Sequence, residues 1–207
     1  GSTAALLEPY ATGPENKGML IHTNEQVEAL VKLARTYNEA VAIHLIGDAG
    51  VEQVLTYLEK YPVPQGKRDR LIHCCYVSEQ QVARMKKLAV ILDIQPAFVA
   101  SDFPWVLDKL GYERTGHLYA WKTFLEEGFI CAAGTDAPIE GISPFETIYA
   151  AVERKKLIKA GYDADFTILN RDLFTCTAQE ILQTTALKTV VAGKIVYEKQ
   201  FAKESHV

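Results

Sequence analysis

Apolar residues along the chain follow two spacings that alternate with each other. Between residues 23 and 36, apolar side chains recur three and four positions apart, which predicts a helix. These positions are Val27, Leu30, Val31 and Ala34. Thr23, with Gln26 three residues later, has the pattern of a capping box at the start of this helix. The run AVAIHLI at 40–46 is then almost continuously apolar, which predicts a strand buried on both faces.

The same alternation of helix and strand is repeated as far as the segment after Ser143. The expected strands are 40–46, 70–75, 89–95 and 129–133. Four further helices are expected. The first carries Val51 to Leu58 and stops at Pro62, and the second starts at Ser78 with Gln81 as its capping partner. The third spans 118–127 before Gly128, and the fourth starts at Ser143 and Pro144. The stretch between residues 96 and 117 is expected to be a loop rich in aromatic side chains. Alternating strands and helices are typical of an α/β fold with parallel strands, and a barrel and a doubly wound sheet both fit this pattern.

The pattern changes after Lys156. The segment ADFTIL predicts one short strand, and TVVAGKIVY predicts two short strands joined at Ala192 and Gly193. We therefore expect two domains, at 1–156 and 157–207. The second is too small to hold a core alone and should pack on another part of the protein.

Composition and charge exclude several classes of protein. Hydrophobic residues make up 48% of the chain and charged residues 23%, and the net charge is -4. The basic runs are short, so nucleic acid is not an expected partner. No apolar stretch approaches the ~20 residues of a membrane span, so no membrane partner is expected. Four cysteines without a CxxC pair fit a reducing cytoplasm better than a disulfide framework or a zinc–cysteine site.

Three side chains that commonly bind metals lie in or just after predicted strands. They are His44 in VAIHLIGD, His73 in RLIHCC and Asp136 in AAGTDAP. The carboxyl ends of parallel strands meet at one edge of a sheet or barrel, so these side chains can converge there. Two imidazoles and a carboxylate can hold a divalent metal such as zinc, and the carboxylate can take a proton from activated water. A single histidine in a strand is more often a hydrogen-bonded core residue, so that interpretation stays open.

Longer segments around these residues resemble the amidohydrolase superfamily. The similarity runs through AIHLIGDAGVEQVL, RLIHCCYVSEQQVARMKKLAVILDIQPAFVASDFPW and YAWKTFLEEGFICAAGTDAPIEGISPFETIYAAV. The branch that it resembles most contains N-substituted formamide deformylase-like enzymes, and ADFTIL and VVAGKIVYE match the small β-sandwich of that branch. The resemblance implies a (β/α)8 barrel with a divalent metal, expected to be zinc, at the carboxyl ends of the strands.

The resemblance also implies roles for individual residues. His44 matches the metal ligand on the fifth strand and His73 the ligand on the sixth. Asp136 matches the aspartate on the eighth strand, which is a ligand and the catalytic proton acceptor from the attacking water. The expected substrate-binding residues are Gln95 at the end of the seventh strand and Ser101, Asp102 and Trp105 in the loop that follows.

Several features of the family are missing from this sequence. It contains no HxH pair, the expected lysine of the fourth strand is absent, and Ile72 stands where the family usually has glutamate. A further helical stretch is missing around residues 156 and 157. The resemblance therefore implies the C-terminal half of such an enzyme, with strands five to eight of the barrel and part of the β-sandwich.

The function that we expect is hydrolysis of a C–N bond in an amide-type small molecule by metal-activated water. This half alone should be inactive, because two or three metal ligands lie outside it. The alternative is a catalytically incomplete half-barrel that acts as an assembly module and pairs with another copy. An upstream HxH in the source gene would favour the enzyme. A third interpretation is a different βα protein in which the histidines are core residues.

Overall fold

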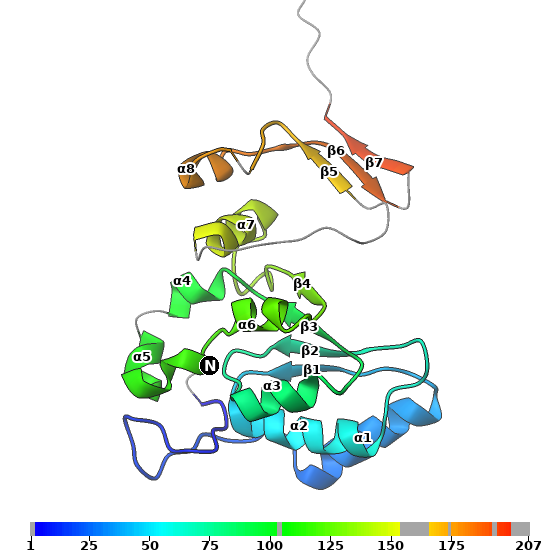
Figure 1. Ribbon diagram of the computed structural model, residues 1–207, viewed down its shortest axis with the longest axis vertical. Helices are drawn as coiled ribbons and strands as arrows, with labels where there is room; N and C mark the ends of the chain where they lie inside the picture. The colour runs from blue at the N-terminus through cyan, green and yellow to red at the C-terminus, as the bar shows by residue number, and fades with distance from the viewer. Residues whose placement is uncertain (1–2, 103–104, 154–165, 174, 192–193, 200–207) are drawn as a thin grey trace, which may run out of the picture.

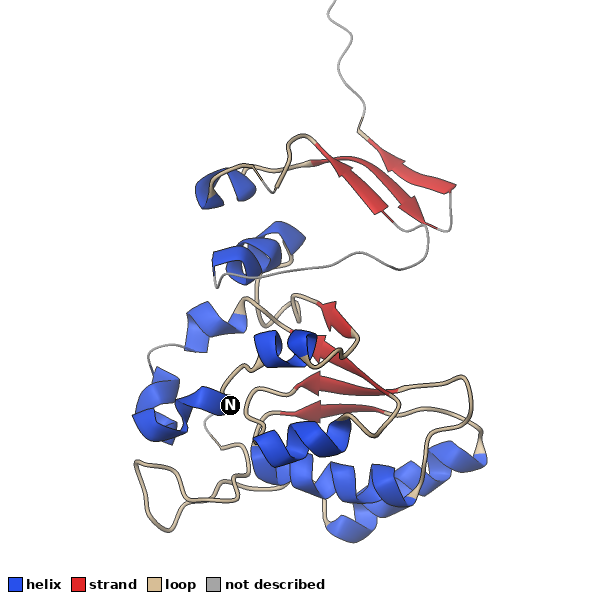
Figure 2. Cartoon of the chain, viewed as in Figure 1, coloured by secondary structure: helices blue, strands red, loops and turns tan. Residues whose placement is uncertain are grey.

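The computed structural model describes residues 3–102, 105–153, 166–173, 175–191 and 194–199 (Figure 1). It contains two separate sheets, one of four strands and one of three, which Figure 2 shows in red. The larger sheet has the strand order β1-β2-β3-β4, and all its neighbours are parallel. This is the mixed α/β architecture with a parallel sheet that the alternating pattern predicts.

The parallel sheet keeps a simple register. Its strands are β1 (Ala42–Leu45), β2 (Asp69–His73), β3 (Val90–Ile94) and β4 (Cys131–Ala133). His44 lies opposite Ile72, Ile72 opposite Asp93, and Asp93 opposite Ala132. Each strand is one or more residues shorter than its apolar run, because pairing ends where the chain turns into a loop. The carboxyl ends of the four strands share one edge of the sheet.

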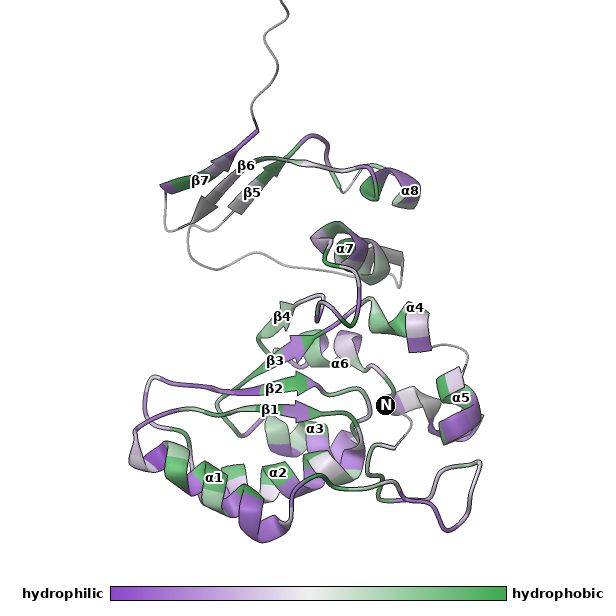
Figure 3. Ribbon diagram, turned by 180° about the vertical axis from the view of Figure 1, so that it is seen from behind, coloured by the Kyte–Doolittle hydropathy of each residue, from purple (hydrophilic) through white to green (hydrophobic). Residues whose placement is uncertain are grey.

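Helices cover one face of this sheet. They include α1 (Asn24–Thr36), α2 (Asp48–Lys60) and α3 (Glu79–Met85). The capping boxes expected at Thr23 and Ser78 are both present. Figure 3 shows hydrophobic and hydrophilic segments alternating along α1 and α2, as expected for helices with one apolar side. Beneath them, Leu71 and Leu92 lie side by side on the sheet and are fully buried.

The opposite face of the sheet is not buried, so the prediction that both faces of every strand are covered is wrong. His44 and Arg70 on this face are exposed, and Asp93 is half-buried. Arg70 binds Asp93 of the next strand through two hydrogen bonds, of 2.8 and 2.6 Å. No element among the described residues packs over this face, and a continuous apolar run cannot reveal which face lacks a partner.

The aromatic stretch after β3 is helical, which corrects the expectation of a loop. It contains α4 (Phe98–Asp102), α5 (Trp105–Leu110) and a 3-10 helix, η1 (Tyr112–His117). Short helices of five or six residues carry too few repeats for a spacing to be recognised. The next helix, α6 (Trp121–Glu126), is shorter than predicted, and Gly128 after it adopts the left-handed conformation expected of a helix end.

The C-terminal part forms the second sheet. Its elements are α7 (Pro144–Glu153), β5 (Phe166–Leu169), α8 (Ala178–Ile181), β6 (Ala186–Val191) and β7 (Lys194–Glu198). These segments form three strands, as expected from their sequences, and the structure pairs them antiparallel in the order β5-β6-β7. The expected junction at Ala192 and Gly193 and the expected domain boundary near 156 lie outside the described residues. No helix in the described ranges has the length and apolar character needed to cross a bilayer.

A buried ion pair ties α1 to the amino end of β2. Asp69 is 2% exposed, and its carboxylate accepts hydrogen bonds from Arg35 Nη2 at 2.6 Å and from the Val41 amide at 2.9 Å. We expect Asp69→Asn to lower the free energy of unfolding by about 3 kcal/mol, because it leaves the Arg35 charge buried and unpaired. Chemical denaturation of the complete protein measures this change. The matched control, Asp108→Asn on the exposed side of α5, should change stability by less than about 0.5 kcal/mol.

Candidate metal centre

The two strand histidines lie against each other at the carboxyl end of the sheet. His44 is the third residue of β1, and His73 is the last residue of β2. Their ring centroids are 4.5 Å apart, with an angle of 77° between the ring planes. His73 and Cys74 both have positive φ angles, of 72° and 46°, which end the regular alternation of the strand. Such conformations are uncommon outside glycine and often mark functional sites.

Asp136 approaches the histidines from the loop after β4. Its Oδ2 lies 3.8 Å from His73 Nε2, and its side chain is 39% exposed. The residue itself has φ 57°, a left-handed conformation that aspartate tolerates better than most residues. The loop is closed by a hydrogen bond from the Ile139 amide to the Asp136 carbonyl at 2.9 Å. The structure thus brings His44, His73 and Asp136 to one place, while their roles as ligands stay a prediction.

Partial removal from water favours the neutral form of both imidazoles. It lowers the pKa of His44, and the neighbouring His73 lowers it further. Burial also lowers the pKa of His73, although Asp136 and the Gln95 side chain act in the opposite direction. Neutral imidazole is the form that binds metals. The donor chemistry at this site therefore suits a divalent metal at neutral pH.

His73 also carries an unsatisfied nitrogen. Its Nδ1 is buried and has no hydrogen-bond partner among the described residues. Buried polar atoms nearly always have a partner, so an orphaned one indicates that a partner group or a water is missing beside Nδ1. The other ring nitrogen, Nε2, lies 3.8 Å from Asp136 Oδ2 and is the nitrogen that faces the carboxylate.

The set of donors is nevertheless incomplete. Within the described parts of the chain, no three histidine, cysteine, aspartate or glutamate side chains come close enough together to hold a metal ion. Two imidazoles are in contact, and one carboxylate lies slightly further away. Imidazole and carboxylate groups are suitable ligands for a divalent metal. Further ligands, or a small movement of Asp136 toward the histidines, would be needed to enclose a metal ion.

The four residues expected to bind substrate lie in two different settings. Gln95 follows β3 directly and is 6% exposed. Its side chain acts to raise the pKa of His73. Ser101 donates a 2.5 Å hydrogen bond to Glu140 of the loop after β4, so its hydroxyl joins α4 to that loop. Its carbonyl accepts a hydrogen bond from Trp105 Nε1 at 3.1 Å. Asp102 and Trp105 line a pocket, whereas Gln95 and Ser101 do not belong to its wall.

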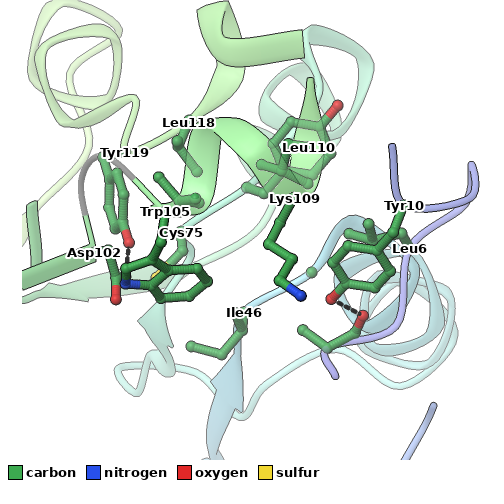
Figure 4. Close-up of a pocket in the computed structure, with 14 residues that line it drawn as sticks. Leu6, Tyr10, Ile46, Cys75, Asp102, Trp105, Lys109, Leu110, Leu118 and Tyr119 are labelled. Carbon is green, nitrogen blue, oxygen red and sulfur yellow. Dashed lines mark hydrogen bonds between the residues drawn. The ribbon is translucent and has the colours of Figure 1, made fainter. Parts of the chain in front are cut away.

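This pocket lies beyond the carboxyl ends of β1 and β2 (Figure 4). One side of the pocket is formed by the residues that follow two strands, Ile46 and Gly47 after β1 and Cys75 and Tyr76 after β2. Residues of α4 and α5 form another side. The enclosed space is about 30 Å³, which is enough for one or two water molecules or one small polar group. The pocket as it stands can hold only one end of a substrate.

The sequence patterns missed two residues of this pocket. Tyr119 donates a short hydrogen bond from its hydroxyl to Asp102 Oδ2, and its φ of 50° is left-handed. No sequence signal marks this tyrosine. Lys109 also lines the pocket, four residues after Trp105. Helical spacing would have placed Lys109 on the same face as Trp105 if the segment had been predicted as a helix.

Comparison with known proteins identifies relatives over most of the chain. A family model described as Amidohydrolase family matches residues 1–157 and 153–197. The protein YtcJ of Bacillus subtilis (strain 168) is 38% identical over 96% of this chain and 45% of its own length. The Arabidopsis thaliana protein LONG AFTER FAR-RED 3 is 30% identical over 74% of this chain and 27% of its own.

Solved structures agree with these relatives. An uncharacterized metal-dependent hydrolase from Pyrococcus furiosus has a TM-score of 0.66 and 33% identity, over 73% of this chain and 31% of its own length. A protein of the same description from Pyrococcus horikoshii has a TM-score of 0.65 and 34% identity, over 74% and 30%. This chain thus spans less than half the length of the relatives that it matches.

Proposed function

Because this chain belongs to the Amidohydrolase family, we propose that it supplies part of the active site of a metal-dependent hydrolase. The reaction that we propose is hydrolysis of a C–N bond in an amide-type small molecule. Two observations support this proposal: the pairing of His44 with His73, and the Pyrococcus relatives, which are described as metal-dependent hydrolases. The relation to the formamide deformylase-like branch belongs to this proposal as well.

The observation that carries the proposal is the state of His73. Its Nε2 lies 3.8 Å from Asp136 Oδ2, its pKa is lowered by burial, and it touches a second histidine. Its buried Nδ1 also lacks a partner, whereas a histidine kept only for packing would be expected to have its polar atoms satisfied. Zinc is the metal that we propose, because imidazole nitrogens with a carboxylate are common zinc ligands.

Each residue has a distinct part in the proposed reaction. A bound divalent cation supplies a Lewis acid that polarises the amide carbonyl and acidifies water. His44 and His73 present neutral nitrogens to it. Asp136 accepts the proton of the attacking water, and its exposed carboxylate can then pass that proton to the leaving nitrogen. Asp102 and Trp105 hold one end of the substrate in the adjoining pocket.

The open face of the parallel sheet supports the view that this chain is half of a barrel. β1 and β4 each pair with a single strand of the parallel sheet, and the face that carries His44 is exposed. We propose that four more strands close the barrel, supply the remaining metal ligands and complete the small β-sandwich. The same open face is what favours the second candidate, an assembly module in which another copy covers it and a homo-oligomer forms. The cellular site that we propose is the cytoplasm.

Metal removal tests the proposed function. We expect the complete protein to lose hydrolysis of amide substrates after treatment with a chelator and to regain it with added Zn²⁺. The 207-residue chain alone should hold no stoichiometric metal after gel filtration, because its donor set is incomplete. Elemental analysis of both samples measures this. Chelator-resistant hydrolysis would contradict the metal-dependent reaction, and a tightly held metal in the isolated chain would contradict the half-site.

A further inference from the structure

The pocket next to the two histidines contains a cation without a partner, and we propose that Lys109 binds a carboxylate group of the substrate. This inference rests on the proposed function, since it names the kind of molecule that the same site would take: an apolar or aromatic body that carries a carboxylate. Its evidence is the placement of Lys109 in a largely apolar pocket.

Lys109 is positioned for this role by α5. Figure 4 shows its side chain extending into the pocket, with the ammonium group near Ile46 and Tyr10. The Tyr10 hydroxyl is itself engaged, since it donates to the Ala4 carbonyl at 2.7 Å. Within the described ranges, no hydrogen bond or ion pair engages Lys109 Nζ. Other lysines in these ranges do form ion pairs, for example Lys86 with Glu127 and Lys60 with Glu28.

The acidic group of the pocket does not neutralise this cation. Asp102 lies on the other side of Trp105 in Figure 4, and its carboxylate is taken by the hydroxyl of Tyr119. No ion pair joins Asp102 to Lys109. The pocket therefore has a positive end and a negative end, so a carboxylate is attracted to the first and repelled by the second. This polarity would fix the orientation of a bound anion as well as its affinity.

Much of the remaining wall is apolar. This apolar part consists of Leu6, Ile46, Val106, Leu110 and Leu118, with the ring of Trp105 beside them. Surroundings of this kind strengthen a charge-assisted hydrogen bond, because they exclude competing water. The space of about 30 Å³ suits a carboxylate group better than a whole substrate, so the apolar body would extend out of the pocket.

Binding of a matched pair of probes tests this inference without turnover. Phenylacetate and phenylacetamide have nearly the same shape and differ in charge. By titration calorimetry of the complete protein at neutral pH and low salt, we expect phenylacetate to bind about tenfold more tightly, the usual value of one charge-assisted hydrogen bond. In Lys109→Met this preference should fall to about one, while the affinity for phenylacetamide stays the same. Lys109→Arg should retain most of the preference.

The control variant is Lys122→Met, an exposed lysine of α6 that pairs with Glu126 one turn away and should leave the preference unchanged. Equal or undetectable binding of the two probes by the wild-type protein would overturn the inference. A preference that survives in Lys109→Met would also overturn it, because the anion would then bind elsewhere, for example at a metal. If the complete protein shows no metal-dependent hydrolysis, the proposed function fails, but the Lys109-dependent preference for phenylacetate can still be observed. Failure of the proposed function and failure of this inference can therefore be told apart.

Discussion

Asp136→Asn is expected to lower kcat of the complete enzyme by about 10²- to 10⁴-fold, the usual contribution of a positioned general base. The amide has nearly the shape of the carboxylate but cannot accept the proton of the attacking water. The left-handed backbone at residue 136 should tolerate asparagine, which adopts this conformation as readily as aspartate. Folding should therefore be preserved, and the loss should appear in kcat more than in KM.

Steady-state kinetics with one amide substrate measures this effect, and thermal unfolding checks the fold. Asp108→Asn is the matched control, since Asp108 is exposed on α5 and lies outside the group of His44, His73 and Asp136. Activity within about threefold of wild type in Asp136→Asn would exclude the proton-accepting role assigned to this residue.

His73→Gln is expected to weaken metal binding by the complete protein by more than about 100-fold. Loss of a residue that only orients a metal ligand costs 10- to 100-fold in affinity, so loss of a ligand should cost more. Glutamine fills a similar volume in a site where the imidazole is 4% exposed, which limits the damage to packing. Competition with a fluorescent zinc chelator measures the dissociation constant.

His117→Gln provides the comparison for this variant, because His117 lies in η1 and no metal-binding role is assigned to it. Its metal affinity should equal that of the wild type. If His73→Gln binds metal as tightly as His117→Gln, His73 is not a ligand and the proposed ligand set is wrong.

The sequence was sufficient to predict the parts of the fold that depend on local pattern. The capping boxes at Thr23 and Ser78, the left-handed Gly128 and the order of parallel strands all follow from residue type and spacing over a few positions. The contact between His44 and His73 follows from the same reasoning, because neighbouring parallel strands bring equivalent ends together.

Features that depend on distant packing could not be predicted in this way. The exposed face that carries His44 and Arg70 has the same apolar neighbours in sequence as a buried one, and the local pattern does not show whether another element packs on it. The Tyr119 hydroxyl reaches Asp102 because the segment after η1 turns back toward α4. Lys109 was missed because α5 is too short to show a helical period.

Anomalous X-ray scattering from crystals of the complete protein, measured on both sides of the zinc absorption edge, tests the central claim most directly. The account predicts one strong anomalous peak at the carboxyl end of the parallel sheet, within bonding distance of His44, His73 and Asp136. The absence of such a peak in zinc-soaked crystals, or a peak only at other residues, would contradict it.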